Sequence, residues 1–259
     1  MILAIDMGNS NIVVGGLDDN KTYFEERITT DDRKTSLEYA ILLKNILEIH
    51  KVKKNDIEGS IMASVVPPLN APISSAVKKI TGKKPLLVGS GMKTGLNIKM
   101  DNPKTVGGDR IVAAVAANAK YEGPIIIADM GTATTLDVVD HDGNYIGGVI
   151  LPGVKVALNS LVSNTAQLPR ISFDVPKRAI GKNTIECMRN GIMLGNAAML
   201  DGLIDRMTAE LGEPATLIAT GGMARFITPL CTHKITYDPD LLLRGLMILY
   251  RQNTEGKDA

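Results

Sequence analysis

The tripeptide Asp-Met-Gly occurs twice in the sequence, at residues 6–8 and 129–131, and each copy follows a short apolar run. Isoleucine-rich runs of this length fit buried strands better than helices, so each Asp is expected at the carboxyl end of a strand. Small hydroxyl or amide residues follow both copies, among them Ser10 and Thr132. Gly lets a phosphate approach backbone amides, and these side chains can bond its oxygens. The pattern predicts a duplicated phosphate site and nucleotide chemistry.

The repeat extends beyond the tripeptide, because a second apolar run and a polar turn follow each copy. The turns are Asp18-Asp19-Asn20 in the first half and residues 140–144 in the second. Each Asp is therefore expected between the strands of a hairpin. Hairpins with such turns are common, and identity over three residues can arise by chance. The matched context nevertheless favours a common architecture for the two halves.

The chain has 259 residues, enough for two domains of ordinary size. We predict subdomains over residues 1–120 and 121–251, with a frayed polar tail over 252–259. The formal net charge of +1 offers no electrostatic reason to expect nucleic acid or an anionic membrane as a partner. No apolar run approaches the ~20 residues that cross a bilayer, and Asp6 interrupts the first one. These features predict a cytoplasmic protein.

The two cysteines, Cys187 and Cys231, have no paired spacing, and the sequence has only three histidines. A zinc site or a disulfide framework is therefore not expected. Both cysteines are predicted to be small buried apolar residues, Cys187 on a helix and Cys231 beside a strand.

Helices are expected in both halves. Thr35 and Glu38 have the spacing of a capping box ahead of an amphipathic helix that reaches Ile49. Further helices are predicted over 106–120, 154–163, 184–211 and 241–250, the third with possible breaks at Gly191, Gly195 and Gly202. Strands are predicted over 61–66 and 85–88.

Two strand-end carboxylates, Asp6 and Asp129, could face one another across a cleft and organise cations around phosphates. Magnesium prefers oxygen ligands, and one or two carboxylates with the nucleotide's own phosphates can hold it. An isolated Asp at such a place caps a turn about as often as it binds a ligand. The pairing of two copies favours the binding role.

Asp109 and Arg110 form a second candidate site at a predicted helix start, after Gly107 and Gly108. The carboxylate could accept a proton from a substrate hydroxyl while the guanidinium holds an anionic group. From residue types alone, an Asp that simply favours the helix dipole is slightly better supported. Thr184 is likewise ambiguous between a helix cap, which is favoured, and a ligand contact.

Thr220-Gly221-Gly222-Met223 follows an apolar run and could bring backbone close to a nucleoside. A plain turn from a strand to a helix explains the same residues equally well.

These motifs, in this order, closely resemble those of type III pantothenate kinases, which belong to the actin-like ATPase superfamily. The resemblance spans almost the whole chain and rests on residues 6–10, 107–110, 129–135, 148–153 with Leu168-Pro169, 180–184 and 220–222. It implies an α/β fold with two ribonuclease-H-like (actin-like ATPase) subdomains, each a mixed sheet flanked by helices. It also implies ATP-dependent phosphorylation of pantothenate to 4'-phosphopantothenate, the first step of coenzyme A synthesis.

The resemblance implies roles for individual residues. Asp109 is expected to accept the proton, Thr132 to contact ATP, and Asp129 to bind a monovalent cation, K⁺ or NH₄⁺, beside the Mg²⁺ that accompanies ATP. A homodimer with the substrate site near the subunit interface is also implied. The implied ATP loop is Asp6, Met7, Gly8, Asn9, Ser10, Asn11, Ile12 and Val13, and the implied pantothenate contacts are Gly107, Gly108, Asp109, Arg110, Thr184 and Met100.

Three positions depart from the family pattern. Met100 stands where the family usually has Tyr before Asp-Asn-Pro, so a hydroxyl expected to hold pantothenate is missing. Ser10 replaces a Thr and keeps its hydroxyl, and Gly108 replaces a small apolar residue. Two alternatives to a pantothenate kinase therefore stay open. One is a non-enzymatic regulator of the accessory transcription factor type, and the other is a kinase of the same superfamily with another small hydroxylated acceptor.

Overall fold

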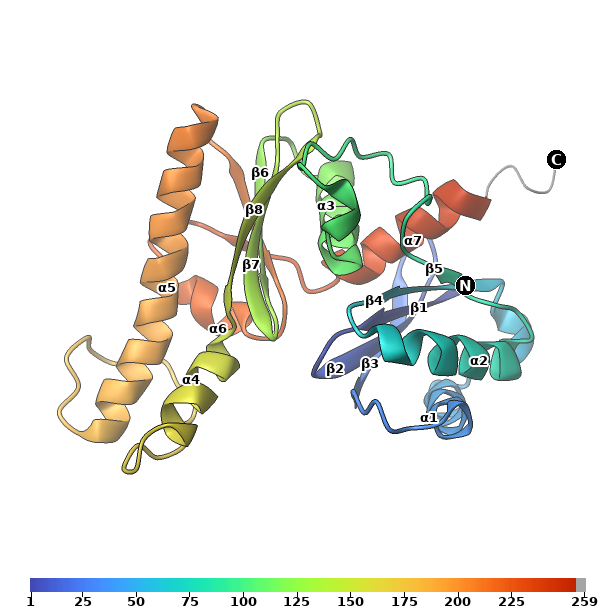
Figure 1. Ribbon diagram of the computed structural model, residues 1–259, viewed down its shortest axis with the longest axis horizontal. Helices are drawn as coiled ribbons and strands as arrows, with labels where there is room; N and C mark the ends of the chain where they lie inside the picture. Colours follow the sequence, from blue (N-terminus) through green and yellow to red (C-terminus); the bar gives the residue numbers. More distant parts are fainter. Residues whose placement is uncertain (255–259) are drawn as a thin grey trace. The chain divides into compact units, whose positions relative to one another are not determined.

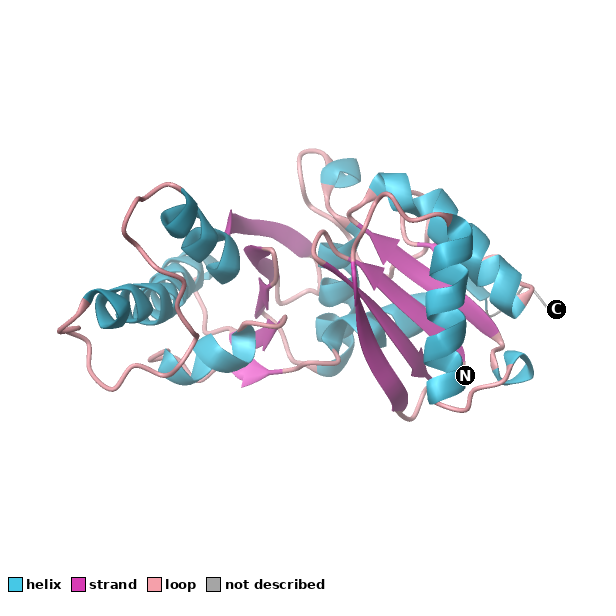
Figure 2. Cartoon of the chain, turned by 90° about the horizontal axis from the view of Figure 1, so that it is seen from below, coloured by secondary structure: helices cyan, strands magenta, loops and turns pink. Residues whose placement is uncertain are grey.

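The computed structural model describes residues 1–254, which form two compact units. The first unit contains residues 1–95, 102–116 and 241–254, and the second contains residues 96–101 and 117–240. Each unit is built on one five-stranded sheet with helices against it (Figures 1 and 2).

The sheet of the first unit has the strand order β3-β2-β1-β4-β5. The hairpin strands β1 and β2 are antiparallel, as are β2 and β3, whereas β4 runs parallel to β1 and β5 parallel to β4. Their bounds are β1 Ile2–Met7, β2 Asn11–Leu17, β3 Thr22–Thr29, β4 Gly59–Ser64 and β5 Leu86–Leu87.

The second unit repeats this sheet, with the order β10-β9-β6-β7-β8. Here β6 takes the place of β1, since it is antiparallel to β7 and parallel to β9. The bounds are β6 Ile125–Met130, β7 Ala133–Val139, β8 Tyr145–Pro152, β9 Thr216–Thr220 and β10 Thr236–Tyr237. The predicted α/β fold with one mixed sheet in each half is confirmed.

The repeat holds at the level of single residues. The burial pattern of β1 is identical to that of β6, and that of β2 is identical to that of β7. The irregularity in the pairing of the second and third strands also recurs, between Gly16 and Leu17 and between Val138 and Val139. Shared register and shared irregularities favour one architecture used twice over chance identity of a tripeptide.

Helices cover both faces of the first sheet. Leu3, Ile5 and Met7 of β1 pack with α1 (Ser36–Ile49) and α2 (Asn70–Thr81). Neighbouring residues of a strand point to opposite faces, so Ile2, Ala4 and Asp6 face the other way. That face carries α7 (Leu241–Thr254), which contacts β1, β2 and β4.

The predicted cap of α1 is confirmed, because Thr35 accepts from the Glu38 backbone and the Glu38 side chain bonds the Thr35 backbone in return. Helix α2 was not predicted. Its N-cap, Leu69, makes no side-chain cap, and Pro72 follows within the first turn. This helix is stabilised by the packing of Ile73 and Val77 in the core, and its start has no local sequence signal.

In the second unit, α4 (Val154–Ser163), α5 (Thr184–Leu211) and α6 (Ala224–Ile227) pack on one face of the sheet. Helix α5 is continuous over 28 residues, so the predicted breaks are wrong. Two of the three glycines, Gly191 and Gly195, lie on its exposed side, where a missing side chain leaves no hole in the core. The remaining helices are α3 Gly108–Lys120, η1 Lys54–Asp56, η2 Pro67–Leu69, η3 Pro103–Thr105 and η4 Thr228–Leu230.

The predicted burial of both cysteines is half right. Cys187 is exposed, because the side of α5 that packs in the core carries Met188, Ile192 and Met193. Cys231 packs against the second core, and burial raises the pKa of its thiol to about 12.

The observed units depart from the predicted contiguous subdomains. Helix α7 was assigned to the C-terminal subdomain, but it belongs to the first unit, because Leu243 packs over Gly15 and Tyr250 over Gly59. Residues 252–254, predicted as part of a frayed tail, form the last turn of α7, and 255–259 lie outside the described residues. Among residues 1–254 no helix is both long enough and apolar enough to span a bilayer.

Gly245 tests the packing of α7 inside the first unit. A Cβ at this position would lie 2.2 Å from the Val112 carbonyl oxygen of α3. We expect Gly245→Ala to lower the free energy of unfolding by roughly 1–3 kcal/mol, because a backbone oxygen cannot move aside as a side chain can. Urea unfolding followed by circular dichroism measures the change.

The matched control is Gly191→Ala in α5, where a Cβ meets nothing within 4 Å. Ala is the better helix former, so this variant should gain roughly 0.5–1 kcal/mol. Equal effects of the two substitutions would contradict the close approach of α3 and α7.

Candidate functional site

The first Asp-Met-Gly sequence lies at the end of β1. Asp6 is half-buried and pairs with Val13 across the hairpin, and Gly8, Asn9 and Ser10 form the connecting loop. The Gly8 N–H donates to the Asn11 carbonyl at 3.0 Å, which closes the turn. The loop is therefore short and tied to its own hairpin.

The eight residues predicted to bind ATP differ in how far they are exposed to solvent. Asn9, Ser10 and Asn11 are exposed, whereas the side chains of Met7 and Ile12 are 0% and 1% exposed and belong to the core. Any contact of Met7 or Ile12 with a ligand must therefore be made by the main chain.

The second Asp-Met-Gly sequence ends β6 in the same way. Asp129 is half-buried and pairs with Thr135, and the loop between β6 and β7 consists of Gly131 and Thr132, both exposed. This loop is one residue shorter than the first. The Gly131 N–H donates to the Ala133 carbonyl at 2.9 Å.

The turn that contains Thr220 and Gly221 packs against the end of β6. Gly221 has φ +89°, and a Cβ there would lie 2.6 Å from Asp129 Oδ1. The Met223 N–H also donates to the Met130 carbonyl at 3.2 Å. The turn joins β9 to α6, as one of the two interpretations expected, and its backbone lies directly against the Asp129 carboxylate.

Asp109 lies in the first turn of α3, and Arg110 follows it. The Arg110 N–H donates to Asp109 Oδ1 at 2.8 Å, so the carboxylate bonds the amino-terminal end of its own helix. A Cβ at Gly107 would lie 2.5 Å from the same oxygen, which explains the glycine. Both side chains are half-buried. This position is compatible with either role of Asp109, an interaction with the helix dipole or the acceptance of a proton from a substrate.

Met100 lies in a short segment that runs beside the start of β8. The Tyr145 N–H donates to the Asn97 carbonyl at 2.9 Å, and the Lys99 N–H donates to the Tyr145 carbonyl at 2.8 Å. The Met100 sulfur lies 3.3 Å from the position of a Cβ at Gly147. A thioether at this place packs over the glycine and offers no hydroxyl.

Thr184 is exposed and is the first residue of α5, not its cap. The cap is Asn183, whose side chain accepts from the Glu186 N–H at 2.9 Å. The favoured interpretation of Thr184 as an N-cap is therefore wrong, because Asn183 takes the cap position and the helix begins at Thr184, the first residue of the predicted range.

The predicted residues divide between the two units. The first unit holds the Asp6 loop with Asp109 and Arg110, and the second holds Asp129, Thr132, Met100 and Thr184. The pairing of Asp6 with Asp129 across a cleft stays a prediction. Within residues 1–254, no three His, Cys, Asp or Glu side chains gather as a metal site. A cation at Asp129 would need further oxygen donors.

The residue most clearly missed by sequence reasoning is Thr30, just beyond β3. Its hydroxyl donates to the Gly8 carbonyl at 2.6 Å and its N–H donates to the Ser10 carbonyl at 3.1 Å. The sequence carried no signal for this contact, because the residue at the matching place after β8 is Gly153, whose N–H bonds the Thr132 carbonyl.

Comparisons with known proteins identify the family of the chain. A family model described as type III pantothenate kinase matches residues 2–206. A type III pantothenate kinase of Exiguobacterium sibiricum is 46% identical over 98% of this chain and 100% of its own length.

Among solved structures, a Campylobacter jejuni protein assigned to the Baf family of transcriptional activators aligns with a TM-score of 0.60 at 19% identity, covering 97% of this chain and 98% of its own. Component A of (R)-2-hydroxyglutaryl-CoA dehydratase from Acidaminococcus fermentans aligns with a TM-score of 0.56 at 16% identity, with 96% of both chains covered. At these identities the two structures support the fold alone.

Gly221 tests the close approach to Asp129. We expect Gly221→Ala to lower the free energy of unfolding by more than Gly212→Ala, the matched control at φ +75° with nothing within 4 Å of its Cβ. Both variants carry the cost of roughly 1–2 kcal/mol for an Ala in the left-handed region. Only the first also collides with the Asp129 carboxylate. Urea unfolding of both proteins measures the difference, and equal losses would contradict the contact.

Proposed function

The chain belongs to the type III pantothenate kinase family, and we propose that it transfers the γ-phosphoryl group of ATP to pantothenate, giving 4'-phosphopantothenate and ADP. This reaction opens coenzyme A synthesis. The observation that carries the proposal is the match to a type III pantothenate kinase over 98% of this chain and the full length of that relative, with the Gly107 to Arg110 motif at the start of a helix.

Asp109 is proposed as the proton acceptor. Its carboxylate would take the proton of the primary hydroxyl of pantothenate while that oxygen forms a bond to the γ-phosphorus and the bond to the ADP oxygen breaks. The hydrogen bond from the Arg110 N–H holds one carboxylate oxygen of Asp109 in place. Arg110 would bind the pantothenate carboxylate through its guanidinium.

Both loops are proposed to contribute to ATP binding, the first through Asp6 to Val13 and the second through Thr132. The exposed residues Asn9, Ser10 and Thr132 offer hydroxyl, amide and backbone N–H donors. Loops that are tied to their hairpins can present these donors without reorganisation, which is what stabilises charge on a transferring phosphoryl group.

Asp129 is proposed to hold a monovalent cation, K⁺ or NH₄⁺. The donor set fits, because a carboxylate against the Gly221 backbone, in reach of a loop with a threonine hydroxyl, offers oxygen and no sulfur or imidazole. When bound, this cation and the Mg²⁺ of the nucleotide neutralise phosphate charge.

The acceptor side is proposed to include Gly107 to Arg110, Thr184 and Met100. Thr184 is exposed and is not occupied as a cap, which supports a ligand role for its hydroxyl. Met100 would contact pantothenate through apolar packing only. We also infer a homodimer in the cytoplasm, with no nucleic acid or membrane partner.

Replacing the proposed base should stop the chemistry and spare binding. We expect Asp109→Asn to lower kcat by about 10²–10⁴-fold, because an amide accepts no proton at neutral pH. Pantothenate-dependent ADP formation, measured with Mg²⁺ and K⁺ supplied, gives kcat, and calorimetry with MgATP checks that nucleotide still binds. Asp142→Asn, in the exposed β7–β8 turn, is the control. Activity that survives in Asp109→Asn excludes this base.

The cation proposal makes a separate prediction. Activity should fall when Na⁺ replaces K⁺, and Asp129→Asn should raise the K⁺ concentration for half-maximal activity by roughly tenfold or more, because the amide lacks the ligand charge. Titration of K⁺ at saturating ATP and pantothenate measures this concentration. A K⁺ response identical to that of the unmodified protein would remove Asp129 from the site.

A further inference from the structure

The residue after the third strand bonds the phosphate loop in both halves. In the first unit the Thr30 N–H donates to the Ser10 carbonyl at 3.1 Å, and in the second the Gly153 N–H donates to the Thr132 carbonyl at 3.1 Å. Thr30 and Gly153 directly follow β3 and β8. The same main-chain bond therefore attaches each loop to its own third strand.

The side chains at these two positions differ for a steric reason. Thr30 adds a hydrogen bond from Oγ1 to the Gly8 carbonyl, at 2.6 Å. A Cβ at Gly153 would lie 2.5 Å from the Gly131 carbonyl oxygen and 2.3 Å from that of Thr132. The shorter second loop excludes a side chain, whereas the extra residue of the first loop leaves room for a threonine.

These bonds decide which way the first loop turns its peptide groups. In a trans peptide the carbonyl and the N–H of the next residue point in opposite directions. Since Thr30 holds the carbonyls of Gly8 and Ser10, the N–H groups of Asn9 and Asn11 point away from Thr30. Both residues are exposed.

We propose that Thr30 is a positioning residue for the first phosphate loop, which holds the loop carbonyls back so that the loop amides, and not carbonyl oxygens, meet the phosphates of ATP. A carbonyl oxygen turned toward a phosphate would repel it. The inference rests on the proposed function, because it assumes that this loop binds nucleotide.

Tyr39 supports Thr30 through the next residue in the chain, Asp31. The Asp31 N–H donates to the Tyr39 hydroxyl at 3.2 Å, and the same hydroxyl donates to the Asp31 carbonyl at 2.8 Å. Tyr39 is 0% exposed and sits in the core of the first unit. The buried Tyr39 hydroxyl of α1 thus fixes the backbone of Asp31, the residue after Thr30.

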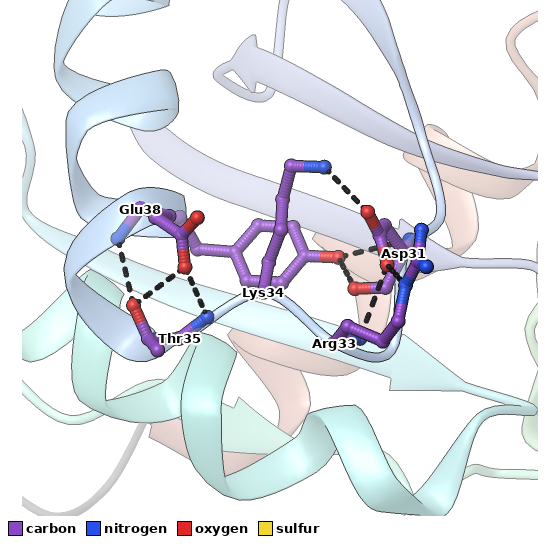
Figure 3. A network of polar contacts seen from close by, with 6 residues as sticks. Asp31, Arg33, Lys34, Thr35 and Glu38 are labelled. Atoms are coloured by element: carbon purple, nitrogen blue, oxygen red, sulfur yellow. Dashed lines mark hydrogen bonds and ion pairs between the residues drawn. The ribbon is translucent and has the colours of Figure 1, made fainter.

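The Asp31 side chain completes this anchor, as Figure 3 shows. Its carboxylate accepts from Lys34 Nζ at 2.9 Å and from the Arg33 N–H and Nε at 3.1 and 3.2 Å. The Lys34 ammonium, followed by the two Arg33 donors, holds the pKa of Asp31 far below its usual range. The carboxylate therefore keeps these bonds at neutral pH. Together with the cap of α1, they hold the segment from Thr30 to the start of this helix in place.

The test compares Thr30→Val, which keeps the shape and removes the hydroxyl, with Thr30→Ser, which keeps the hydroxyl. Thr22→Val, at the far end of β3, is the matched control. Calorimetry with MgATP should show a Kd about fivefold to tenfold higher in Thr30→Val, as one lost hydrogen bond allows, and within twofold of the unmodified protein in the other two. The KM for pantothenate should not change in any of the three variants.

An unchanged Kd in Thr30→Val, or an equal loss in Thr30→Ser, overturns the proposal. If Thr30→Val does not fold, Tyr39→Phe carries the test. It should weaken MgATP binding in the same direction, and unaltered affinity counts against the proposal. An unmodified protein that binds MgATP without pantothenate-dependent turnover refutes the proposed function and leaves this comparison valid. An unmodified protein that does not bind MgATP refutes both.

Discussion

The pairing of each central strand with its hairpin partner determines where the Asp6 and Asp129 carboxylates lie. In β1 the core residue Ile5 and the half-buried Asp6 are neighbours on opposite faces, and the register sets Asp6 across from Val13. A slip of one residue would turn the carboxylate into the apolar core and Ile5 out of it. Burial of the apolar residues therefore fixes the carboxylate at the strand end, and the second half uses the same constraint for Asp129.

The elements that could be predicted from the sequence are those with strong local signals, such as caps and apolar runs. The Thr35 and Glu38 capping box identified α1, and the twin apolar runs identified the hairpins. The sequence did not predict the elements whose presence or position depends on packing in the folded protein. Helix α2 has no side-chain cap, and α7 shows nothing local to say which sheet it covers. Its place depends on Gly15 and Gly59, whose missing side chains make room for Leu243 and Tyr250, and such complementarity exists only in three dimensions.

The same distinction between local signals and tertiary packing applies to the candidate site. The Asp-Met-Gly loops and the start of α3 could be predicted, because their residue types and spacing follow from the chemistry of phosphates and helix ends. Thr30 could not be, since it becomes a neighbour of Gly8 only through the antiparallel pairing of β2 and β3. The cap of α5 was misplaced by one residue because Asn183 and Thr184 are both good capping types.

The two loops keep two hydrogen bonds in common, the bond that closes the turn and the bond from the third strand, and differ in their length and in the residue after the third strand. The first has an extra residue and a threonine that holds its carbonyls back, which suits an anion approaching exposed amides. The second is shorter, has a glycine where a side chain would collide, and places its carboxylate against the Gly221 backbone, which suits a cation. Loop length and the residue after the third strand differ together, since a threonine follows β3 beside the longer loop and a glycine follows β8 beside the shorter one. Repetition of the hairpin and divergence of its loop length thus explain how one motif can support two proposed roles in the binding of ATP.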